Sequence, residues 1–403
     1  MRHDAPSSLL PSCYVLSVRV LLLVVLVVAA ALAAVGLLAT SEYGRASGLL
    51  VRAARLEHPL PRLAAGWQAS EVTTRERSLP SRRGSLRARV YTPAVVRTRP
   101  LLLLGGIHAL GIDEPRLRHF ATEIARSGTV VVTPELPDLL SYLITARLTD
   151  DIEDAALALA RETAAASPGE APRIAMLGVS FSGGLAIVAA GRPALRDHVG
   201  FVFSFGGHAS LTRVLRYLAT GQHPAGEVAP PHDYGGVVLL MNAADLLVPP
   251  DQVPLLREGL GRFLHASHVA MFDAARADRE FEDARLYEQR MPAETRRLLH
   301  LVNTRDTEGI GTVLLPHVLR RRDDVALSPE LAPAPSAPVY LLHAEGDNII
   351  PTPEAMALST SLRARGTSVR MVTTGLLAHA EVRRTPGVRE VVDLVRFWAE
   401  MPW

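Results

Sequence analysis

The chain has 403 residues and a formal net charge of +2, so its charge gives no reason to expect a nucleic-acid partner. All 43 basic residues are arginines, and the absence of lysine excludes a Schiff base, a Ser–Lys dyad and a phosphate-binding loop of the Walker type. The one cysteine, Cys13, excludes an intrachain disulfide, and 14 scattered histidines without an H-E-x-x-H pair give no support for a metal site.

Residues 20–39 form an unbroken apolar run of the length that a helix needs to cross a bilayer core of about 30 Å. The run is longer than the core of an ordinary signal peptide, although cleavage near its alanine-rich end is an alternative. Arginines flank it on both sides, so the positive-inside rule does not set the orientation. We favour a single-pass signal anchor with the globular part extracytoplasmic. The tail and anchor then occupy residues 1–41, and a stalk or approach helix follows at 42–69.

From residue 70 onward, predicted strands and helices alternate. The strands are expected at 71–79, 85–91, 101–104, 129–133 and 200–205. Helices are expected after Asp113, which can cap the first of them, and over 151–166. Several of the strands are fully apolar. Such strands, alternating with helices, favour an α/β domain whose mainly parallel sheet is covered on both faces.

Between residues 207 and 337 the pattern becomes helical. Helices are expected at 211–219, 237–247, 253–264, 275–287 and 294–302. Residues 237–241 taken alone also fit a strand. The dense charges of 276–285 indicate a solvent-exposed helix face. Strands at 339–342 and 369–372 and a last helix at 388–398 follow. We therefore expect a core of residues 70–206 and 338–403, interrupted by a helical insertion at 207–337.

The segment Gly178-Val179-Ser180-Phe181-Ser182-Gly183-Gly184 lies between a short apolar strand and a helix. A serine at such a sharp turn presents its hydroxyl above the sheet, and small residues on both sides let strand and helix pass closely. The free N–H groups at the start of the helix would face an oxyanion formed there. The plain alternative is an ordinary turn that contains serine for its backbone preferences.

This segment resembles the nucleophile elbow of the α/β-hydrolase superfamily, whose pattern is G-x-S-x-G. Ser182 stands at the last position, which opens a second register with Ser182 as nucleophile; Gly178, two residues before Ser180, favours Ser180. The resemblance covers nearly everything after residue 70 and implies an α/β-hydrolase fold. It also implies that the insertion at 207–337 is a helical lid.

The acid of a catalytic triad follows the serine in the chain order of this superfamily. The resemblance implies Asp347, in the turn after the strand at 339–342; a turn aspartate that caps its neighbours is the plain alternative. Asp245 is a second candidate if 237–241 is a core strand, and Glu345 is a lesser one.

The base is implied to be His379, on the loop between the strand at 369–372 and the last helix. A serine hydroxyl is a weak nucleophile and needs such a base, which an acid must orient. The alternative is a loop histidine with an ordinary backbone hydrogen bond. His343 lies within a strand and is expected to be structural.

The resemblance further implies an oxyanion hole made of two backbone N–H groups, those of Phe181 and Ile107. Ile107 follows Gly105-Gly106 in the loop after the strand at 101–104, where the superfamily often has His-Gly. The alternative for these glycines is a tight strand-to-loop turn. His108 and His208 are expected to line the mouth of the site.

These expectations describe a membrane-anchored serine hydrolase that cleaves small-molecule carboxylic esters through an acyl-enzyme, and an anchor next to lipid would suit lipophilic esters. The implied residues are Ser180, His379 and Asp347, with no metal and no cofactor. The same triad serves thioesters and peptides, which are alternatives. A hydrolase fold that has lost catalysis and acts as an anchored binding protein is the alternative from another class.

Overall fold

The structure is a computed structural model, and it describes residues 36–37, 40–55, 66, 68–166, 173–226, 228, 230–320, 324–378, 381–382 and 387–403. Apart from residues 36 and 37, the expected anchor at 20–39 lies outside the described residues, and so does His379. Among the described residues, no helix is both long and apolar enough to span a bilayer.

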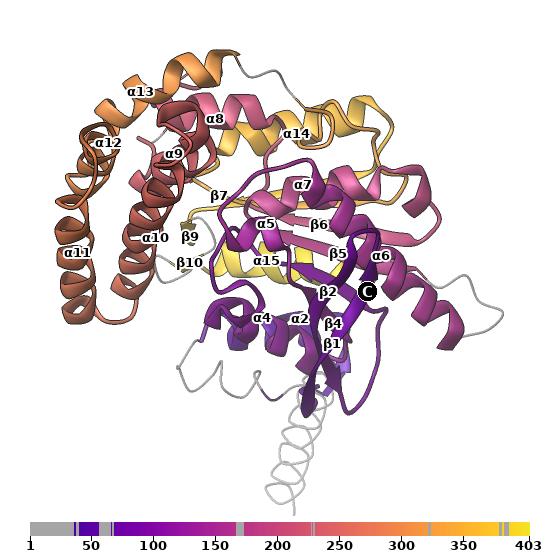
Figure 1. Cartoon of the computed structure of the whole chain (residues 1–403). Helices are drawn as coiled ribbons and strands as arrows, with labels where there is room; N and C mark the ends of the chain where they lie inside the picture. Colours follow the sequence, from indigo (N-terminus) through magenta and orange to yellow (C-terminus); the bar gives the residue numbers. More distant parts are fainter. Residues whose placement is uncertain are drawn as a thin grey trace, which may run out of the picture.

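An eight-stranded sheet forms the centre of the molecule (Figure 1). Its strands, in the order β1-β2-β4-β3-β5-β6-β7-β8, are β1 (Val72–Ser81), β2 (Gly84–Pro93), β4 (Val131–Pro134), β3 (Leu101–Leu104), β5 (Ile174–Val179), β6 (Val199–Phe205), β7 (Val339–Ala344) and β8 (Val369–Thr374). β2 pairs antiparallel with β1 and β4, and all other pairs are parallel. This mostly parallel α/β sheet fits the α/β-hydrolase fold.

Helices cover both faces of the sheet (Figure 1). On one face lie α2 (Glu42–Ala53), α4 (Pro115–Arg126) and α15 (Val388–Ala399); on the other lie α6 (Arg147–Ala166), α7 (Phe181–Ala190) and α14 (Thr352–Ala364). Short elements complete the core: η1 (Gly111–Asp113), α5 (Pro137–Leu140), η2 (Pro193–Leu195), β9 (Leu377–Ala378) and β10 (Glu381–Val382). β9 and β10 pair with each other beside the carboxyl end of β7.

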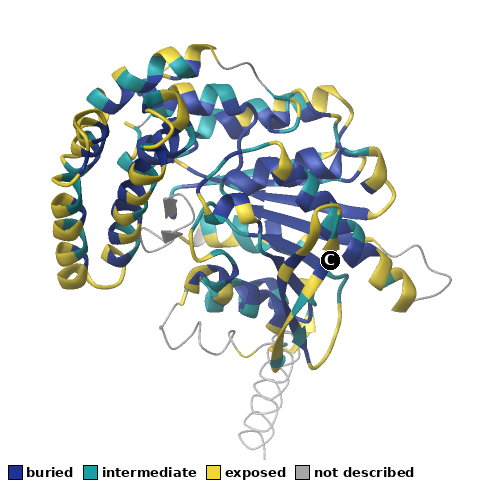
Figure 2. Cartoon of the chain, viewed as in Figure 1, coloured by how far each residue is buried: buried dark blue, intermediate teal, exposed yellow. Residues whose placement is uncertain are grey.

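Two apolar cores result, because successive residues of a strand point to opposite faces. Leu101 and Leu103 of β3 pack with α2, α4 and α15, whereas Leu102 and Leu104 pack with α6 and α7. The central strands are therefore buried on both sides, as Figure 2 shows in dark blue. Burial on both faces explains why these strands are continuous apolar runs in the sequence.

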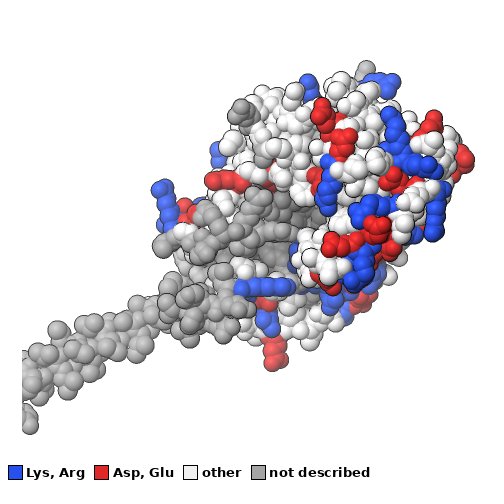
Figure 3. All heavy atoms as spheres, turned by 90° about the vertical axis from the view of Figure 1, so that its left-hand side faces the viewer, with Lys and Arg blue, Asp and Glu red and all other residues white. Residues whose placement is uncertain are grey.

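All elements described between β6 and β7 are helices, and we call Leu211–Arg320 the helical insertion. They are α8 (Leu211–Thr220), α9 (Asp233–Leu247), α10 (Val253–Ala270), α11 (Ala274–Glu288), α12 (Ala293–Asn303) and α13 (Thr307–Arg320). α11 buries only Ala277 and Ala284, and acidic and basic side chains are intermixed on this side of the molecule (Figure 3). α13 was not expected, and it continues through Pro316.

Of the two expectations for residues 42–69, a stalk or an approach helix, residues 42–53 fit the helix: α2 buries Ala46 and Leu49 in the core, and Arg52 forms an ion pair with Glu123 of α4 at 2.8 Å. One local expectation is wrong. Asp113 does not cap α4, since the carboxylate of Glu114 accepts the N–H of Leu117 at 2.7 Å.

Candidate active site

Ser180 lies at the turn between β5 and α7 in a backbone conformation that serine rarely adopts. Its φ is 57° and its ψ is −134°; such a conformation costs about 1–3 kcal/mol. The turn is held by two backbone bonds: the Ser180 N–H donates to Phe205 at 2.7 Å, and the Ser180 carbonyl accepts the N–H of Gly183 at 2.8 Å. Strain of this kind is typical of a turn that presents a nucleophile.

Gly178 is required for this turn. A β carbon at Gly178 would collide with the backbone of Ser182 and would lie 2.7 Å from the nitrogen of Gly183. Only glycine lets β5 and α7 pass at this distance. The spacing of small residues around Ser180 therefore has a steric cause.

Ser182, the alternative nucleophile, faces a different part of the molecule. Its side chain is fully buried, and its hydroxyl donates to the carbonyl oxygen of Gly105 at 2.6 Å. Ser180 is partly exposed. The geometry therefore favours the register with Ser180 as nucleophile.

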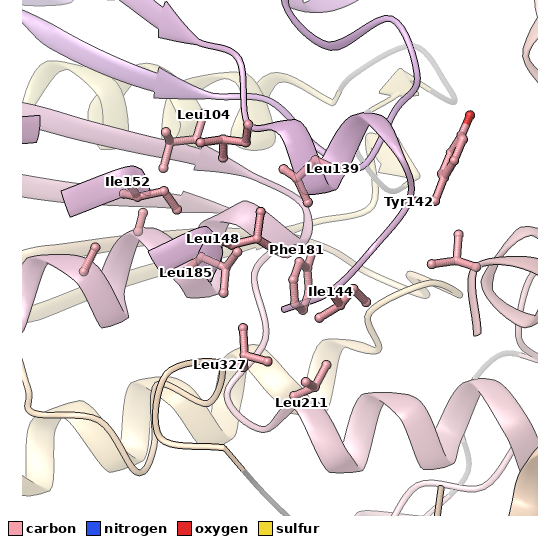
Figure 4. Packing of buried hydrophobic residues seen from close by; sticks show 14 of the residues in the cluster. Leu104, Leu139, Tyr142, Ile144, Leu148, Ile152, Phe181, Leu185, Leu211 and Leu327 are labelled. Atoms are coloured by element: carbon pink, nitrogen blue, oxygen red, sulfur yellow. The ribbon is translucent and has the colours of Figure 1, made fainter. Parts of the chain in front are cut away.

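The two expected oxyanion donors belong to segments next to Ser180. A β carbon at Gly106, next to Ile107, would lie 3.5 Å from the β carbon of Ser180. Phe181 is the first residue of α7, so its N–H has no intrahelical acceptor. Among the described residues, neither this N–H nor that of Ile107 has a hydrogen-bond acceptor. The Phe181 side chain points away, into the apolar core beside Ile144 (Figure 4).

Asp347 follows β7 at the same edge of the sheet. Its carboxylate is buried, and Oδ1 accepts the N–H groups of Ile349 at 2.9 Å and Ile350 at 3.0 Å. Oδ2 and the Cα of Ser180 each lie 3.9 Å from the point where a β carbon of Gly206 would be. Asp347 and Ser180 are therefore neighbours across Gly206, which follows β6.

Asp245, the alternative acid, is not near this edge. Residues 237–241 belong to α9, so the strand that this alternative requires does not form. Asp245 is exposed and accepts a hydrogen bond from Arg257 of α10 at 2.9 Å. Its sequence pattern is that of a helix end followed by proline. Glu345 is also exposed, and its N–H pairs with the carbonyl of Thr374.

His379, the expected base, lies outside the described residues. The described residues that flank it are β9 and β10, which lie beside the carboxyl end of β7 and thus at the edge that carries Asp347. His343 of β7 is buried, with Nε2 at 2.8 Å from the carbonyl oxygen of Ile350 and 3.6 Å from Oδ2 of Asp347. It holds the turn that carries Asp347, in keeping with the structural role that the sequence indicated.

His108 connects the loop after β3 to the helical insertion. Its Nδ1 accepts the N–H of Leu110 at 3.1 Å, so its Nε2 carries the proton that is donated to Nδ1 of His268, 2.9 Å away on α10. Burial, and then the neighbouring His268, lower the pKa of His108 to about 4. This histidine is neutral at physiological pH.

His208 does not line the mouth of the site, and that expectation is wrong. The residue is fully buried, its ring stacks on Phe181 with centroids 4.6 Å apart, and its Nε2 lies 2.8 Å from the carbonyl oxygen of Leu327. Burial lowers the pKa of His208. Its neutral ring packs against Phe181, the first residue of α7.

Tyr234 of α9 also reaches the loop after β3, and nothing in the sequence pointed to it. Its hydroxyl donates to the carbonyl oxygen of Ile107 at 2.8 Å. Burial raises the pKa of Tyr234, so the hydroxyl keeps the proton that it donates. The helical insertion therefore touches the loop through both Tyr234 and His268.

No protein-family model matches the chain, and no curated protein is detectably similar to it. Solved structures that resemble it include an esterase of Pyrobaculum calidifontis, with 17% identity, a TM-score of 0.43 and coverage of 89% of this chain and 90% of that one. A thermophilic carboxylesterase cloned from a metagenomic library has 17% identity, a TM-score of 0.46 and coverage of 85% and 92%. The acylaminoacyl peptidase of Pyrococcus horikoshii has 13% identity, a TM-score of 0.43 and coverage of 78% and 38%, so the chain spans less than half of the peptidase. Likeness at this level does not bear on activity or substrate.

Proposed function

We propose that this chain is a serine hydrolase that cleaves carboxylic esters through Ser180, His379 and Asp347. The observation that carries the proposal is the strained backbone of Ser180 at the start of α7, with buried Asp347 beside it across Gly206. A conformation of this kind persists only where the surroundings impose it, and such sites are concentrated at reacting groups.

In the proposed reaction, the Ser180 hydroxyl attacks the ester carbonyl and His379 accepts its proton. His379 then donates the proton to the leaving alkoxide, and the alcohol departs. The N–H groups of Phe181 and Ile107 stabilise the tetrahedral oxyanion, aided by the positive end of the α7 dipole. Water, deprotonated by His379, then attacks the acyl carbon. The bond to Oγ of Ser180 breaks, the carboxylic acid departs and His379 returns the proton to Ser180. Asp347 holds the imidazole in the tautomer that accepts the proton.

Esters are proposed ahead of amides because an alcohol leaves a tetrahedral intermediate more readily than an amine does. The side chains of Ile107 and Tyr234 pack on the apolar core beside the elbow, at the edge where the substrate would bind. Such surroundings suit an acyl group with little polarity.

A fluorophosphonate probe tests the nucleophile. We expect the probe to label the wild-type chain at Ser180 and to leave Ser180→Ala unlabelled. Hydrolysis of p-nitrophenyl butyrate should fall by at least about 1,000-fold in the same variant. Labelling of Ser182, or equal labelling of wild type and Ser180→Ala, would contradict the proposal. A wild-type chain that is neither labelled nor active would support the binding-protein alternative.

We also propose that residues 20–39 anchor the protein in a membrane, with the hydrolase on the extracytoplasmic side. The support is the length and apolar character of the run. The full-length chain should stay in the membrane fraction after alkaline carbonate extraction, with Met1 or a residue near it as the mature N-terminus. A mature N-terminus beyond residue 39 would instead indicate a cleaved signal peptide.

A further inference from the structure

The first residues of the loop after β3 have little of their own to fix their shape. They are Gly105 and Gly106, and glycine leaves the backbone freer than any other residue. The donor proposed for the oxyanion is the N–H of Ile107, which belongs to the peptide between Gly106 and Ile107. A donor stabilises an oxyanion only when it is already oriented before the charge develops. Something outside the loop must therefore hold this peptide.

The peptides immediately before and after it are each held by a side-chain hydroxyl. Ser182 of α7 donates to the carbonyl of Gly105 at 2.6 Å, and Tyr234 of α9 donates to the carbonyl of Ile107 at 2.8 Å. A peptide unit is planar, so holding its carbonyl also fixes the direction of its N–H. With both flanking planes held, the two Cα atoms of the Gly106–Ile107 peptide are held as well, and the peptide is left with rotation about the line between them alone.

Both hydroxyls lie where such bonds are strong. Ser182 has no exposed surface, and burial raises the pKa of Tyr234. Both bonds are partly buried, and a carbonyl that is partly screened from water is poorly compensated when it loses its donor, so each bond helps to fix where the loop rests. The two donors come from different elements, α7 of the core and α9 of the insertion.

We propose that Ser182 and Tyr234 are positioning residues that clamp the Gly106–Ile107 peptide in the orientation required of an oxyanion donor. The inference rests on the proposed hydrolase function. It gives Ser182 a role at the position where the superfamily pattern has glycine. It also makes the helical insertion a part of the catalytic arrangement, through Tyr234.

Kinetics of the full-length chain with p-nitrophenyl butyrate test the clamp. Ser182→Ala and Tyr234→Phe should each lower kcat by about 10- to 100-fold, with KM changed by less than about twofold, because the lost orientation matters only in the transition state. The affinity of an alkyl trifluoromethyl ketone, which forms a tetrahedral adduct, should fall by the same factor as kcat/KM. The double variant should lose less than the product of the single losses, since both residues hold one peptide.

Two matched variants control for the loss of a hydroxyl as such. Ser204→Ala removes a buried hydroxyl on β6 that lies beside Gly183 and has no hydrogen-bond partner among the described residues. Tyr340→Phe removes a hydroxyl that donates to the carbonyl of Glu400 at 3.1 Å, on the face of the sheet covered by α15. Both should keep the wild-type kcat. If Ser182→Ala and Tyr234→Phe behave like these controls, the clamp is wrong.

Hydrogen exchange separates the clamp from the proposed function. Amide protons of residues 105–109 should exchange at least about tenfold faster in Ser182→Ala and Tyr234→Phe than in the two control variants. This readout needs no catalysis, so it decides the clamp even if the wild-type chain cleaves no ester. Unchanged exchange in this loop would overturn the inference, whereas faster exchange in an inactive chain would leave the clamp standing and refute the hydrolase.

Discussion

Nε2 of His108 and Nδ1 of His268 lie 2.9 Å apart, and this contact joins the loop after β3 to α10 of the helical insertion. The pair needs His268 to accept a proton at Nδ1, which a protonated ring cannot do. Burial lowers the pKa of both histidines, that of His108 to about 4. Glu114, Arg116 and His265 face the pair as well, and the carboxylate of Glu114 alone acts against the lowering.

The contact between His108 and His268 predicts that the folded chain loses stability in acid. Because the pKa of His108 is lower in the folded chain than its ordinary value near 6.5, the unfolded chain binds more protons between about pH 4 and pH 6.5. The stability that the neutral ring contributes is present above pH 6.5 and is lost as the pH falls toward 4. We expect the free energy of unfolding, measured with urea, to fall over this window by up to about 2 kcal/mol more in wild type than in His108→Asn. Equal slopes would show that His108 does not titrate with unfolding.

Glu354 of α14 is predicted to be essential for stability. Its fully buried carboxylate accepts the N–H groups of Ala209 and Ser210, each at 2.9 Å, and the Nε of Arg213 at 2.7 Å. Glu354→Gln removes one of the two carboxylates that pair with Arg213, the one whose own side chain is fully buried. We expect a loss of about 3 kcal/mol in the free energy of unfolding.

Glu330 provides the comparison for this prediction. It binds the same Arg213 through two hydrogen bonds, at 2.7 and 2.8 Å, but it is partly exposed. Glu330→Gln should therefore lower the free energy of unfolding by less than about 1 kcal/mol. A loss as large as that of Glu354→Gln would mean that burial does not decide the effect.

Asp347→Asn should lower activity by impairing the orientation of the base, while the fold of the turn is kept. The amide oxygen of asparagine can still accept the N–H groups of Ile349 and Ile350, so the turn should persist. We expect kcat for an ester to fall by about 10³- to 10⁴-fold, because an amide cannot hold the imidazole in the required tautomer. Asp245→Asn, at the exposed alternative position, should keep wild-type activity. The reverse result would make Asp245 the acid.

The sequence pointed to the elbow and the acid turn because each is a local pattern. Gly178 and Ser180 are separated by one residue between a strand and a helix, and Asp347 lies in the turn that follows an apolar strand. The choice between Ser180 and Ser182 could be argued only from the position of one glycine. The observation that favours Ser180 in the structure is a hydrogen bond from Ser182 to Gly105, which lies 77 residues earlier in the chain.

Contacts of the helical insertion could not be predicted from the sequence either, because they join residues that lie far apart in the chain. Tyr234 and His268 lie on helices whose direction depends on packing, and both bond to a loop more than 100 residues before them. Residues 42–53 were expected to be a stalk or an approach helix, because small apolar residues between arginines do not show what they pack against. The structure gives Ala46 and Leu49 partners from α4 and α15.

Two glycines, one at the elbow and one in the insertion, should respond in opposite directions to the same substitution. In Gly178→Ala the new methyl group would collide with backbone atoms of Ser182, which cannot move without moving Ser180. We expect a loss of about 3 kcal/mol or more in the free energy of unfolding, together with a large loss of fluorophosphonate labelling.

Gly261 lies inside α10, where a β carbon would meet nothing within 4 Å. Gly261→Ala should raise the free energy of unfolding by about 0.5–1 kcal/mol, because alanine restricts the unfolded chain and favours a helix. Labelling at Ser180 should be unchanged, since Gly261 is not at the carboxyl edge of the sheet. Urea unfolding and probe labelling of both variants, side by side with wild type, check the pair. A well-tolerated Gly178→Ala would mean that β5 and α7 are not packed as closely as the steric account of the elbow requires.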